Sequence, residues 1–341
     1  MWSAIFSRQR GRIAGSIALV LLLGVFGYAG YMAYQYKQMT KRWYQPLGEE
    51  RTEISQPGTA GAKTPSPAPP AAEPPVIPRV KPLKPFTLLL IGTDSRDGER
   101  ARADTMMLAV LRPASQQVYL LSIPRDSYMN LPGKGFDKVN HALAFGGTPL
   151  LKASLEGFFQ VKIDRYVTID FDGFRKLIDE LGGVEIEVKK RMKYTDPTDD
   201  TYIDLHPGRQ VLNGEQALDY ARYRKSDLGR EDSDMERVQR QQEIVQALAQ
   251  KGESLQTYLK AFRLIEILGD HVKTDLSEAE ITSLLAAYHD NLQNRLVTDT
   301  LMGTDERIWR QGVRGWYYLI PKTEQQRVQQ RLQAELSGQQ P

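Results

Sequence analysis

The chain has 341 residues, of which 41% are hydrophobic, and its 45 basic and 42 acidic side chains leave a formal net charge of only +3. This length suits one large domain with appended segments, and the near-neutral charge does not favour a nucleic-acid-binding protein. The absence of cysteine and of an HExxH motif excludes disulfides, thiolate catalysis and the common zinc sites. Any metal ion would therefore be a hard cation bound by oxygen atoms.

The amino-terminal segment predicts a membrane anchor. Residues 13–34 form an uncharged apolar run that is long enough to span a bilayer, and residues 1–12 before it contain three arginines. The run is longer than the apolar core of a signal peptide, and it ends in aromatic residues suited to a membrane interface. We therefore expect one transmembrane helix with a short cytoplasmic tail, so that the bulk of the chain lies outside the cytoplasm.

Residues 35–85 are expected to be a juxtamembrane segment and linker. From residue 46 onward Pro, Ala, Gly, Ser and Thr dominate, and no helix or strand period recurs. We interpret this stretch as an extended spacer that holds the folded domain away from the membrane, with a proline-rich ligand for a partner module as the alternative. The globular domain is then expected at residues 86–336, followed by a tail at 337–341.

Three apolar runs open the globular domain, and each predicts a buried strand because Gly or Pro stops it. They cover residues 86–91, 105–111 and 118–123. If the strands pair antiparallel, the end of the first, the start of the second and the end of the third share one sheet edge. That edge carries Asp94, Asp104 and Arg125, which could bind a metal-bound phosphate. The alternative is that they are two turn aspartates and a surface arginine.

Strand-like and helix-like segments alternate through the rest of the domain, which predicts an α/β fold with a mixed, largely antiparallel central sheet flanked by helices. We expect helices at 149–159, 172–181, 214–222 and from 323, and strands at 166–169, 184–188, 296–302 and 316–320. Two helix starts carry capping boxes, Asn213 with Gln216 and Ser277 with Glu280.

A second group of charged residues lies between 213 and 242. Arg222 and Arg224 fall at or just past the end of one predicted helix, and Asp234 is the expected cap of the next. Arg237 and Gln241 lie in line with the apolar residues of that second helix, so they should point inward, near backbone N–H groups that favour an anion. The alternative is a solvated helix with i, i+4 ion pairs.

Seven motifs in this order closely resemble the LytR-CpsA-Psr family over about residues 86–336. They are GTDSR, RADTMML, SIPRD, DKVNHALAFGG, DFDGFRKLIDELGGVEIEV, LNGEQALDYARYRKSD and DMERVQRQQ. Members are membrane-anchored phosphotransferases of the bacterial envelope. The resemblance implies transfer of a glycopolymer, such as a teichoic acid, a capsule or another wall polymer, from a polyprenyl-diphosphate carrier to peptidoglycan. The expected acceptor is the C6 hydroxyl of N-acetylmuramic acid.

The resemblance also implies roles for individual residues. Asp94 and Asp104 match the family's magnesium-associated acidic pair, and Mn²⁺ could replace Mg²⁺. The expected pyrophosphate-binding residues are Arg102, Arg125, Lys138, Arg222, Arg224, Arg237 and Gln241. Glu236 departs from the glycine of many members. Chemically, a metal ion and several arginines would neutralise the diphosphate, and Asp104 or Asp94 would deprotonate the acceptor hydroxyl.

Two other functions are compatible with part of this interpretation. If water replaces the sugar hydroxyl, the protein is a polyprenyl-diphosphate hydrolase. It could instead be a membrane-bound regulator or lipid-carrier-binding protein without catalytic activity. Against this last reading, the tail before the apolar run is short and has no helix-turn-helix, and the basic residues gather around acidic ones.

Overall fold

The computed structural model describes residues 44–46, 84–94, 102–198, 201–251, 269–288, 295–310 and 312–338. The expected cytoplasmic tail, the expected membrane span at 13–34 and most of the expected linker lie outside these residues. Within the described part of the chain, no helix is both long enough and apolar enough to cross a membrane.

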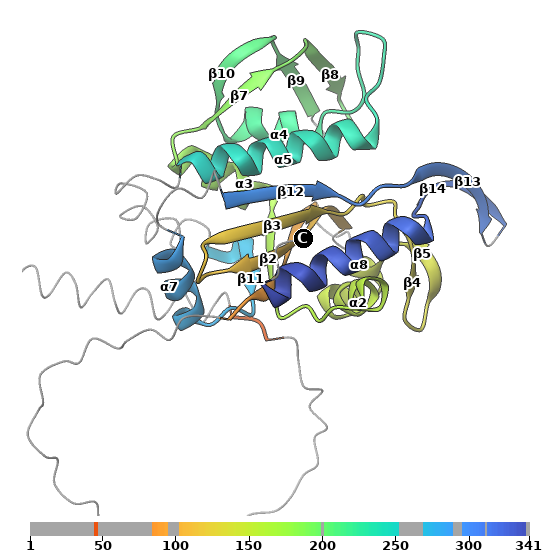
Figure 1. Cartoon of the computed structure of the whole chain (residues 1–341). Coiled ribbons are helices and arrows are strands. Elements are labelled where there is room, and N and C mark those ends of the chain that lie inside the picture. Colours follow the sequence, from red (N-terminus) through yellow and green to blue (C-terminus); the bar gives the residue numbers. More distant parts are fainter. Residues whose placement is uncertain are drawn as a thin grey trace, which may run out of the picture.

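The core of the domain is a six-stranded sheet in the order β11-β6-β1-β2-β3-β12 (Figure 1). Its strands are β1 Phe86–Asp94, β2 Arg102–Arg112, β3 Gln117–Ser122, β6 Arg165–Asp170, β11 Val272–Thr274 and β12 Leu296–Thr300. Neighbours pair antiparallel at β11–β6, β1–β2 and β2–β3, and parallel at β6–β1 and β3–β12. The prediction of a mixed, largely antiparallel central sheet is therefore confirmed.

Both faces of this sheet are covered by helices. Leu89, Ile91 and Leu108 pack with α2 (His141–Phe159) and α8 (Lys322–Ser337). The alternate residues of the same strands, such as Leu88 and Met107, pack with α5 (Asp234–Lys251) and α7 (Glu278–Ala287) on the other face. Strands buried on both faces contain few polar residues, which is why these strands appear in the sequence as continuous apolar runs.

A smaller unit lies beyond α5, at the top of Figure 1. Its core joins α3 (Phe171–Glu180), α4 (Gly214–Arg222) and α5 to two hairpins. These hairpins pair β7 (Val184–Val188) with β10 (Gly208–Leu212), and β8 (Met192–Asp196) with β9 (Thr201–Leu205). The capping box at the start of α4 is formed as expected, with Gln216 N donating to Asn213 Oδ1 at 2.9 Å.

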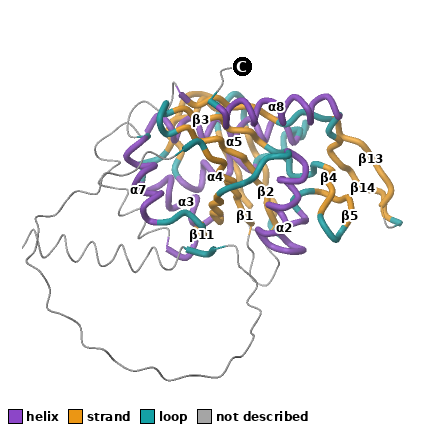
Figure 2. Tube along the Cα trace, turned by 60° about the horizontal axis from the view of Figure 1, so that its bottom comes forward, coloured by secondary structure: helices purple, strands orange, loops and turns teal. Residues whose placement is uncertain are grey.

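Two further hairpins lie side by side at one end of the molecule in both views (Figures 1 and 2). They pair β4 (Tyr128–Leu131) with β5 (Gly135–Lys138), and β13 (Thr304–Arg310) with β14 (Val313–Leu319). The Tyr128 and Tyr317 rings meet edge to face with centroids 5.2 Å apart. Only β14 was predicted, in part, because the other three strands are short or strongly polar.

The helical segment after β5 contains a kink. Gly146 and Gly147 have non-helical backbone angles within α2, and Gly147 has φ +65°. A Cβ atom on Gly146 would lie 2.7 Å from Cβ of Leu150, so a side chain there would clash. The glycine pair therefore separates two helical stretches, the second of which covers the helix predicted at 149–159.

Residues 44–46 pair with the edge of the main sheet, although they lie in the segment expected to be a linker. Tyr44 forms a parallel bridge with Thr274 of β11, and Gln45 N donates to Thr274 O at 2.9 Å. The hydroxyl of Tyr166 donates to the Gln45 carbonyl at 2.7 Å. The folded domain thus includes a short segment from far upstream in the chain.

Candidate active site

A β-bulge at one end of the main sheet places Asp104. Gly92 pairs with Thr105, but Thr93 pairs with Ala103, so Asp104 is the extra residue on β2. On a regular strand, residues three positions apart face opposite sides of the sheet. Ala103 and Met106 nevertheless pack in the same core cluster. The bulge therefore turns Asp104 away from the regular ladder towards the sheet edge, as bulges beside active sites often do.

The shared sheet edge predicted from the sequence is formed. Asp94 at the end of β1 pairs with Arg102 at the start of β2. Beyond β3, Ile123 N still donates to Met106 O at 2.9 Å, and this continuation brings Arg125 back to β2. Arg125 Nη1 lies 2.5 Å from Asp104 Oδ1. Asp104 and Arg125 therefore meet at the edge of the sheet, and Asp94 ends the adjoining strand at the same edge, as the antiparallel pairing predicted.

Arg125 lies among three carboxylates. Its Nε is 3.9 Å from Asp126 Oδ2 and 4.0 Å from Asp234 Oδ1, in addition to the contact with Asp104. Burial by itself would lower the pKa of Arg125, but Asp104, Asp126 and Asp234 outweigh it and raise that pKa. The guanidinium is therefore a permanent cation at the centre of the cluster.

Lys138 supplies a second cation. Its Nζ lies 2.7 Å from Asp126 Oδ1 and 5.5 Å from the centroid of the Tyr317 ring. Lys138 ends β5, so the β4–β5 hairpin positions it. Asp126 was not among the predicted site residues, although it directly follows Arg125 in the SIPRD motif.

The amino-terminal end of α5 supplies a third, buried cation. Arg237 is 5% exposed and Asp234 is 9% exposed, and Arg237 Nη2 lies 2.5 Å from Asp234 Oδ1. Burial lowers the pKa of Arg237 despite Asp234, and the nearby cations Arg125 and Arg224 act in the same direction. Both Asp234 oxygens and Arg237 Nε make no hydrogen bond within the described residues, so the close ion pair lacks hydrogen-bond geometry and leaves polar atoms for a ligand or water.

The prediction that Asp234 caps α5 is wrong. Asp234 is the first residue of the helix, and the cap is Ser233, whose Oγ accepts from Glu236 N at 3.2 Å. Glu236 returns the interaction by accepting from Ser233 N at 2.7 Å, which completes a capping box. The sequence S-x-x-E carries this signal. The capping box gives Glu236 a structural role at the position where many members of the resembled family have glycine.

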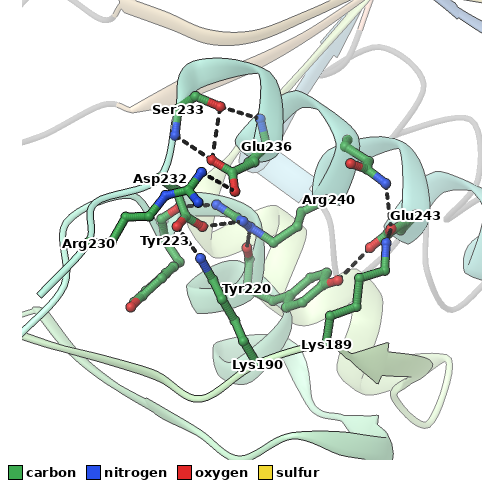
Figure 3. Close-up of polar contacts among 11 residues, drawn as sticks. Lys189, Lys190, Tyr220, Tyr223, Arg230, Asp232, Ser233, Glu236, Arg240 and Glu243 are labelled. Carbon is green, nitrogen blue, oxygen red and sulfur yellow. Dashed lines mark hydrogen bonds and ion pairs between the residues drawn. The ribbon is translucent and has the colours of Figure 1, made fainter. Parts of the chain in front are cut away.

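A buried ionic network holds the segment between α4 and α5 in place (Figure 3). Arg240 donates to the carbonyl of Tyr220 at 2.8 Å, to the carbonyl of Tyr223 and to Asp232 Oδ2 at 2.7 Å. Asp232 also pairs with Lys190, and its backbone N–H donates to Arg224 O at 2.7 Å. The network thus ties the backbone of Arg224 to α5, which carries Arg237.

Three further predicted residues, Arg224, Gln241 and Arg222, are located through the elements and charges around them. Arg224 acts electrostatically on Arg237, and Gln241 lies one turn further along α5. The Arg222 guanidinium carbon lies 4.6 Å from the Phe171 ring centroid, beside the carboxyl end of β6. β6 runs parallel to β1 with Asp170 opposite Thr93, so Arg222 lies on the Asp94 side of the site.

Asp305 is a residue near the site that the sequence did not reveal. Its side chain is exposed, but partial desolvation raises its pKa, and the negative charges of Asp234 and Asp126 raise that pKa further, while Arg224 and Lys138 oppose them. The β13–β14 hairpin brings Asp305 there, because Tyr318 N of β14 donates to Asp126 O at 2.9 Å. No sequence pattern connects Asp305 with Asp126.

The cluster can bind an anion with several charged oxygens. Within the described residues no three or more His, Cys, Asp or Glu side chains form a ready metal cage. Asp94 and Asp104 on adjoining strands are hard oxygen donors, which fits a Mg²⁺ ion that takes its other ligands from phosphate and water. Arg125, Lys138 and Arg237 surround the same region and could neutralise phosphate oxygens.

Comparisons with known proteins agree with one another. The model of the LytR_cpsA_psr family matches residues 34–334. TagU of Oceanobacillus iheyensis, named polyisoprenyl-teichoic acid–peptidoglycan teichoic acid transferase, is 34% identical over 247 residues, which cover 71% of this chain and 73% of TagU. The TagU of Bacillus subtilis is 32% identical over 225 residues, or 66% of this chain and 70% of TagU.

Solved structures have the same fold. The crystal structure of Bacillus subtilis TagV matches with a TM-score of 0.64 and 30% identity, and the match covers 76% of this chain and 99% of TagV. The structure of TagT bound to LI-WTA matches with a TM-score of 0.60 and 29% identity, and covers 77% of this chain and 95% of TagT.

Proposed function

Because this chain belongs to the LytR-CpsA-Psr family, we propose that it is a phosphotransferase that moves a glycopolymer from a polyprenyl-diphosphate carrier to peptidoglycan. The observation that carries the proposal is the charge arrangement at the sheet edge, where Arg125 lies 2.5 Å from Asp104 and near Asp126 and Asp234. Relatives named as teichoic acid transferases support this reaction class.

The chemistry requires attack on phosphorus. The oxygen of the acceptor hydroxyl, expected to be the C6 hydroxyl of N-acetylmuramic acid, attacks the phosphorus that bears the glycopolymer. The bridging bond between that phosphorus and the diphosphate oxygen breaks, and polyprenyl phosphate leaves with the bonding electrons. The product is a phosphodiester between glycopolymer and glycan, and the hydroxyl proton passes to a carboxylate of the protein.

The arginines and the lysine supply most of the electrostatic stabilisation. A diphosphate carries at least two negative charges, so attack by an oxygen nucleophile needs them neutralised. Arg125 and Lys138 are held at the sheet edge, and Arg237 is a buried cation whose pKa is lowered by burial, so an anionic ligand would stabilise its charged form. We assign Arg102, Arg222, Arg224 and Gln241 supporting contacts with the same diphosphate.

Asp94 and Asp104 would hold a Mg²⁺ or Mn²⁺ ion, which when bound neutralises phosphate oxygens and lowers the pKa of an oxygen that it binds. One of the two aspartates would also accept the proton of the acceptor hydroxyl. The bulge that exposes Asp104 supports the choice of this residue as the base, because the side chain leaves the regular ladder at the sheet edge.

A polyprenyl-linked substrate is confined to a membrane, which fits the apolar run at residues 13–34. We propose that this run is a single-pass anchor with an inside amino terminus and that the folded domain lies outside the cytoplasm. Which polymer is transferred, a teichoic acid, a capsule or another wall polymer, depends on contacts with the sugars of the donor.

The test uses the full-length chain in detergent micelles. It is incubated with a short-chain prenyl-diphosphate-linked oligosaccharide, peptidoglycan fragments and Mg²⁺, and the glycan products are analysed by mass spectrometry. A phosphodiester-linked adduct on muramic acid, absent with EDTA and with Asp104→Asn, is the expected result. Phosphorylated oligosaccharide without an adduct would show a hydrolase, and intact bound donor would show a carrier-binding protein; either result would overturn the transferase.

A further inference from the structure

The β13–β14 hairpin has two chemically different faces. Directly paired residues of antiparallel strands lie on the same face of a hairpin. The pairs Ile308–Gly315 and Glu306–Tyr317 therefore belong to one face, on which Tyr317 packs against Tyr128 and Lys138. This inner face covers the β4–β5 hairpin.

The opposite face carries two tryptophans and two arginines. The pairs are Arg307 with Trp316 and Trp309 with Arg314. Trp309 is 71% exposed and Trp316 is 55% exposed, although tryptophan is usually highly buried. The two indoles occupy diagonal positions on neighbouring strands, so they can present one broad aromatic surface. We call these four residues the Trp–Arg face.

The arrangement of this face is partly fixed before any ligand binds. The Arg307 guanidinium carbon lies 5.1 Å from the Trp316 ring centroid, a cation–π contact that orders both side chains. Paired in this way, Arg307 holds a positive charge against the aromatic surface. Flat apolar rings flanked by guanidinium groups suit a ligand that has apolar sugar faces and carboxylates.

The face begins at the site. Asp305 lies two residues before Arg307 on the same strand and therefore on the same face, and its cross-strand partner Tyr318 donates its backbone N–H to Asp126 O at 2.9 Å. From Asp305 the surface runs outward through Arg307 and Trp316 to Trp309. At roughly 3.4 Å per strand residue, Asp305 to Trp309 covers about 14 Å. A long acceptor that enters the site could thus continue along the hairpin.

We propose that the Trp–Arg face binds the peptidoglycan glycan strand that provides the acceptor hydroxyl. The proposal rests on the proposed function and adds an acceptor subsite to it. The tryptophans would stack on sugar rings, and Arg307 and Arg314 would bind free carboxylates of the stem peptides. Asp305 marks the point at which the strand reaches the diphosphate site.

A membrane surface is the competing occupant, because Trp and Arg are also common at lipid headgroups. The topology favours the glycan. Residues 44–46, the described residues closest in sequence to the expected membrane span, lie beside β11 at one edge of the sheet, whereas the hairpin follows β12 at the other edge. In both views the β13–β14 hairpin projects at one end of the domain, and β11 lies well away from it (Figures 1 and 2).

The test measures binding and transfer separately, with full-length protein in detergent. Wild type, Trp309→Ala, Trp316→Ala and the double variant are sedimented with purified peptidoglycan sacculi stripped of attached polymers. We expect the double variant to bind about tenfold more weakly, and Trp316→Phe, which keeps a flat ring, to retain most of the binding. Controls are Val313→Ala on the inner face of the same hairpin and Tyr202→Ala, an exposed aromatic residue on β9.

Transfer assays complete the test. With polymeric acceptor the double variant should show a raised KM and an unchanged kcat, while a single disaccharide acceptor should react equally well with both proteins. Unchanged sedimentation of the double variant would overturn the proposal. Loss of wild-type binding to sacculi when phosphatidylglycerol is added to the detergent micelles would also overturn it, because a lipid headgroup would then occupy this face. If wild type binds sacculi through this face yet transfers nothing, the proposed function fails and the binding surface stands.

Discussion

The guanidinium of Arg125 and the carboxylate of Asp104 meet 2.5 Å apart at the sheet edge, although 20 other residues separate them in the chain. The contact depends on the β-bulge in β2 and on the extension of β3 pairing through Ile123. It leaves each side chain about one-quarter exposed, so a ligand can reach both.

Asp104→Asn should therefore abolish most of the activity without unfolding the protein. The amide keeps the shape of the side chain but loses the charge and the basicity, and we expect the transfer rate to fall by at least about 100-fold. Steady-state transfer assays and thermal melts measure the two effects. Asp172→Asn, at an exposed carboxylate paired with Arg175, is the matched control. Activity within about threefold of wild type would contradict the role of Asp104.

Inorganic pyrophosphate should stabilise the wild-type protein through Arg237. Burial lowers the pKa of this arginine, so an anion that compensates its charge binds the folded state preferentially. We expect pyrophosphate to raise the Tm of the wild type by a few degrees, on the order of 1 kcal/mol, and to have a much smaller effect on Arg237→Gln. Arg175→Gln, at an exposed arginine, should respond like wild type. Equal shifts in all three proteins would exclude Arg237 from the anion site.

The Arg240 network should contribute strongly to stability. The Asp232 side chain is fully buried against Arg240, so Asp232→Ala leaves an unpaired buried cation and should lower the free energy of unfolding by about 3 kcal/mol. Lys190→Ala removes the other partner of Asp232, but this lysine is 40% exposed, and its loss should cost under about 1 kcal/mol. Urea denaturation of both variants provides the comparison. Equal losses of unfolding free energy in the two variants would mean that the buried charge of Arg240 does not explain the effect of Asp232→Ala.

Stability should depend on pH through Asp219. Burial raises the pKa of this carboxyl group to about 7, with a further contribution from Glu215. The folded chain therefore holds the proton more tightly than the unfolded chain, whose carboxyl has the ordinary pKa of 3.8. As pH rises from about 4 to about 7, the free energy of unfolding therefore falls by up to about 4 kcal/mol. Above a pH of about 7 Asp219 causes no further change in that free energy.

Asp219→Asn isolates this effect, because every other titrating group is shared with the wild type. Unfolding free energies at pH 5 and pH 8 should show the variant gaining stability relative to wild type as the pH rises. Parallel stability curves for the two proteins would show that Asp219 titrates normally.

The strands of the main sheet could be predicted because both faces are covered, which makes them apolar throughout. The same reasoning predicted the shared edge of Asp94, Asp104 and Arg125. It did not predict the bulge, because the register of β1 and β2 depends on tertiary packing around Ala103 that leaves no local pattern.

Other features left weaker sequence signals. The cap at Ser233 was detectable as S-x-x-E, but the neighbouring Asp234 is an equally good capping residue. The β13 strand has mainly charged and exposed residues, so neither hydrophobic alternation nor an apolar run marks it. Asp305 was missed for this reason, since only the pairing of β13 with β14 brings it near Asp126.

The segment of Tyr44 and Gln45 beside β11 sets how far the active site can reach from the bilayer. With the proposed membrane span at 13–34, only residues 35–43 separate the span from Tyr44, and even fully extended they measure about 30 Å. The proline-rich residues 47–83 lie between two points of the same domain, at residues 46 and 84. Lengthening residues 47–83 would therefore add no reach. In the proposed topology the tether is residues 35–43, which would keep the domain close to the headgroups where a polyprenyl diphosphate resides.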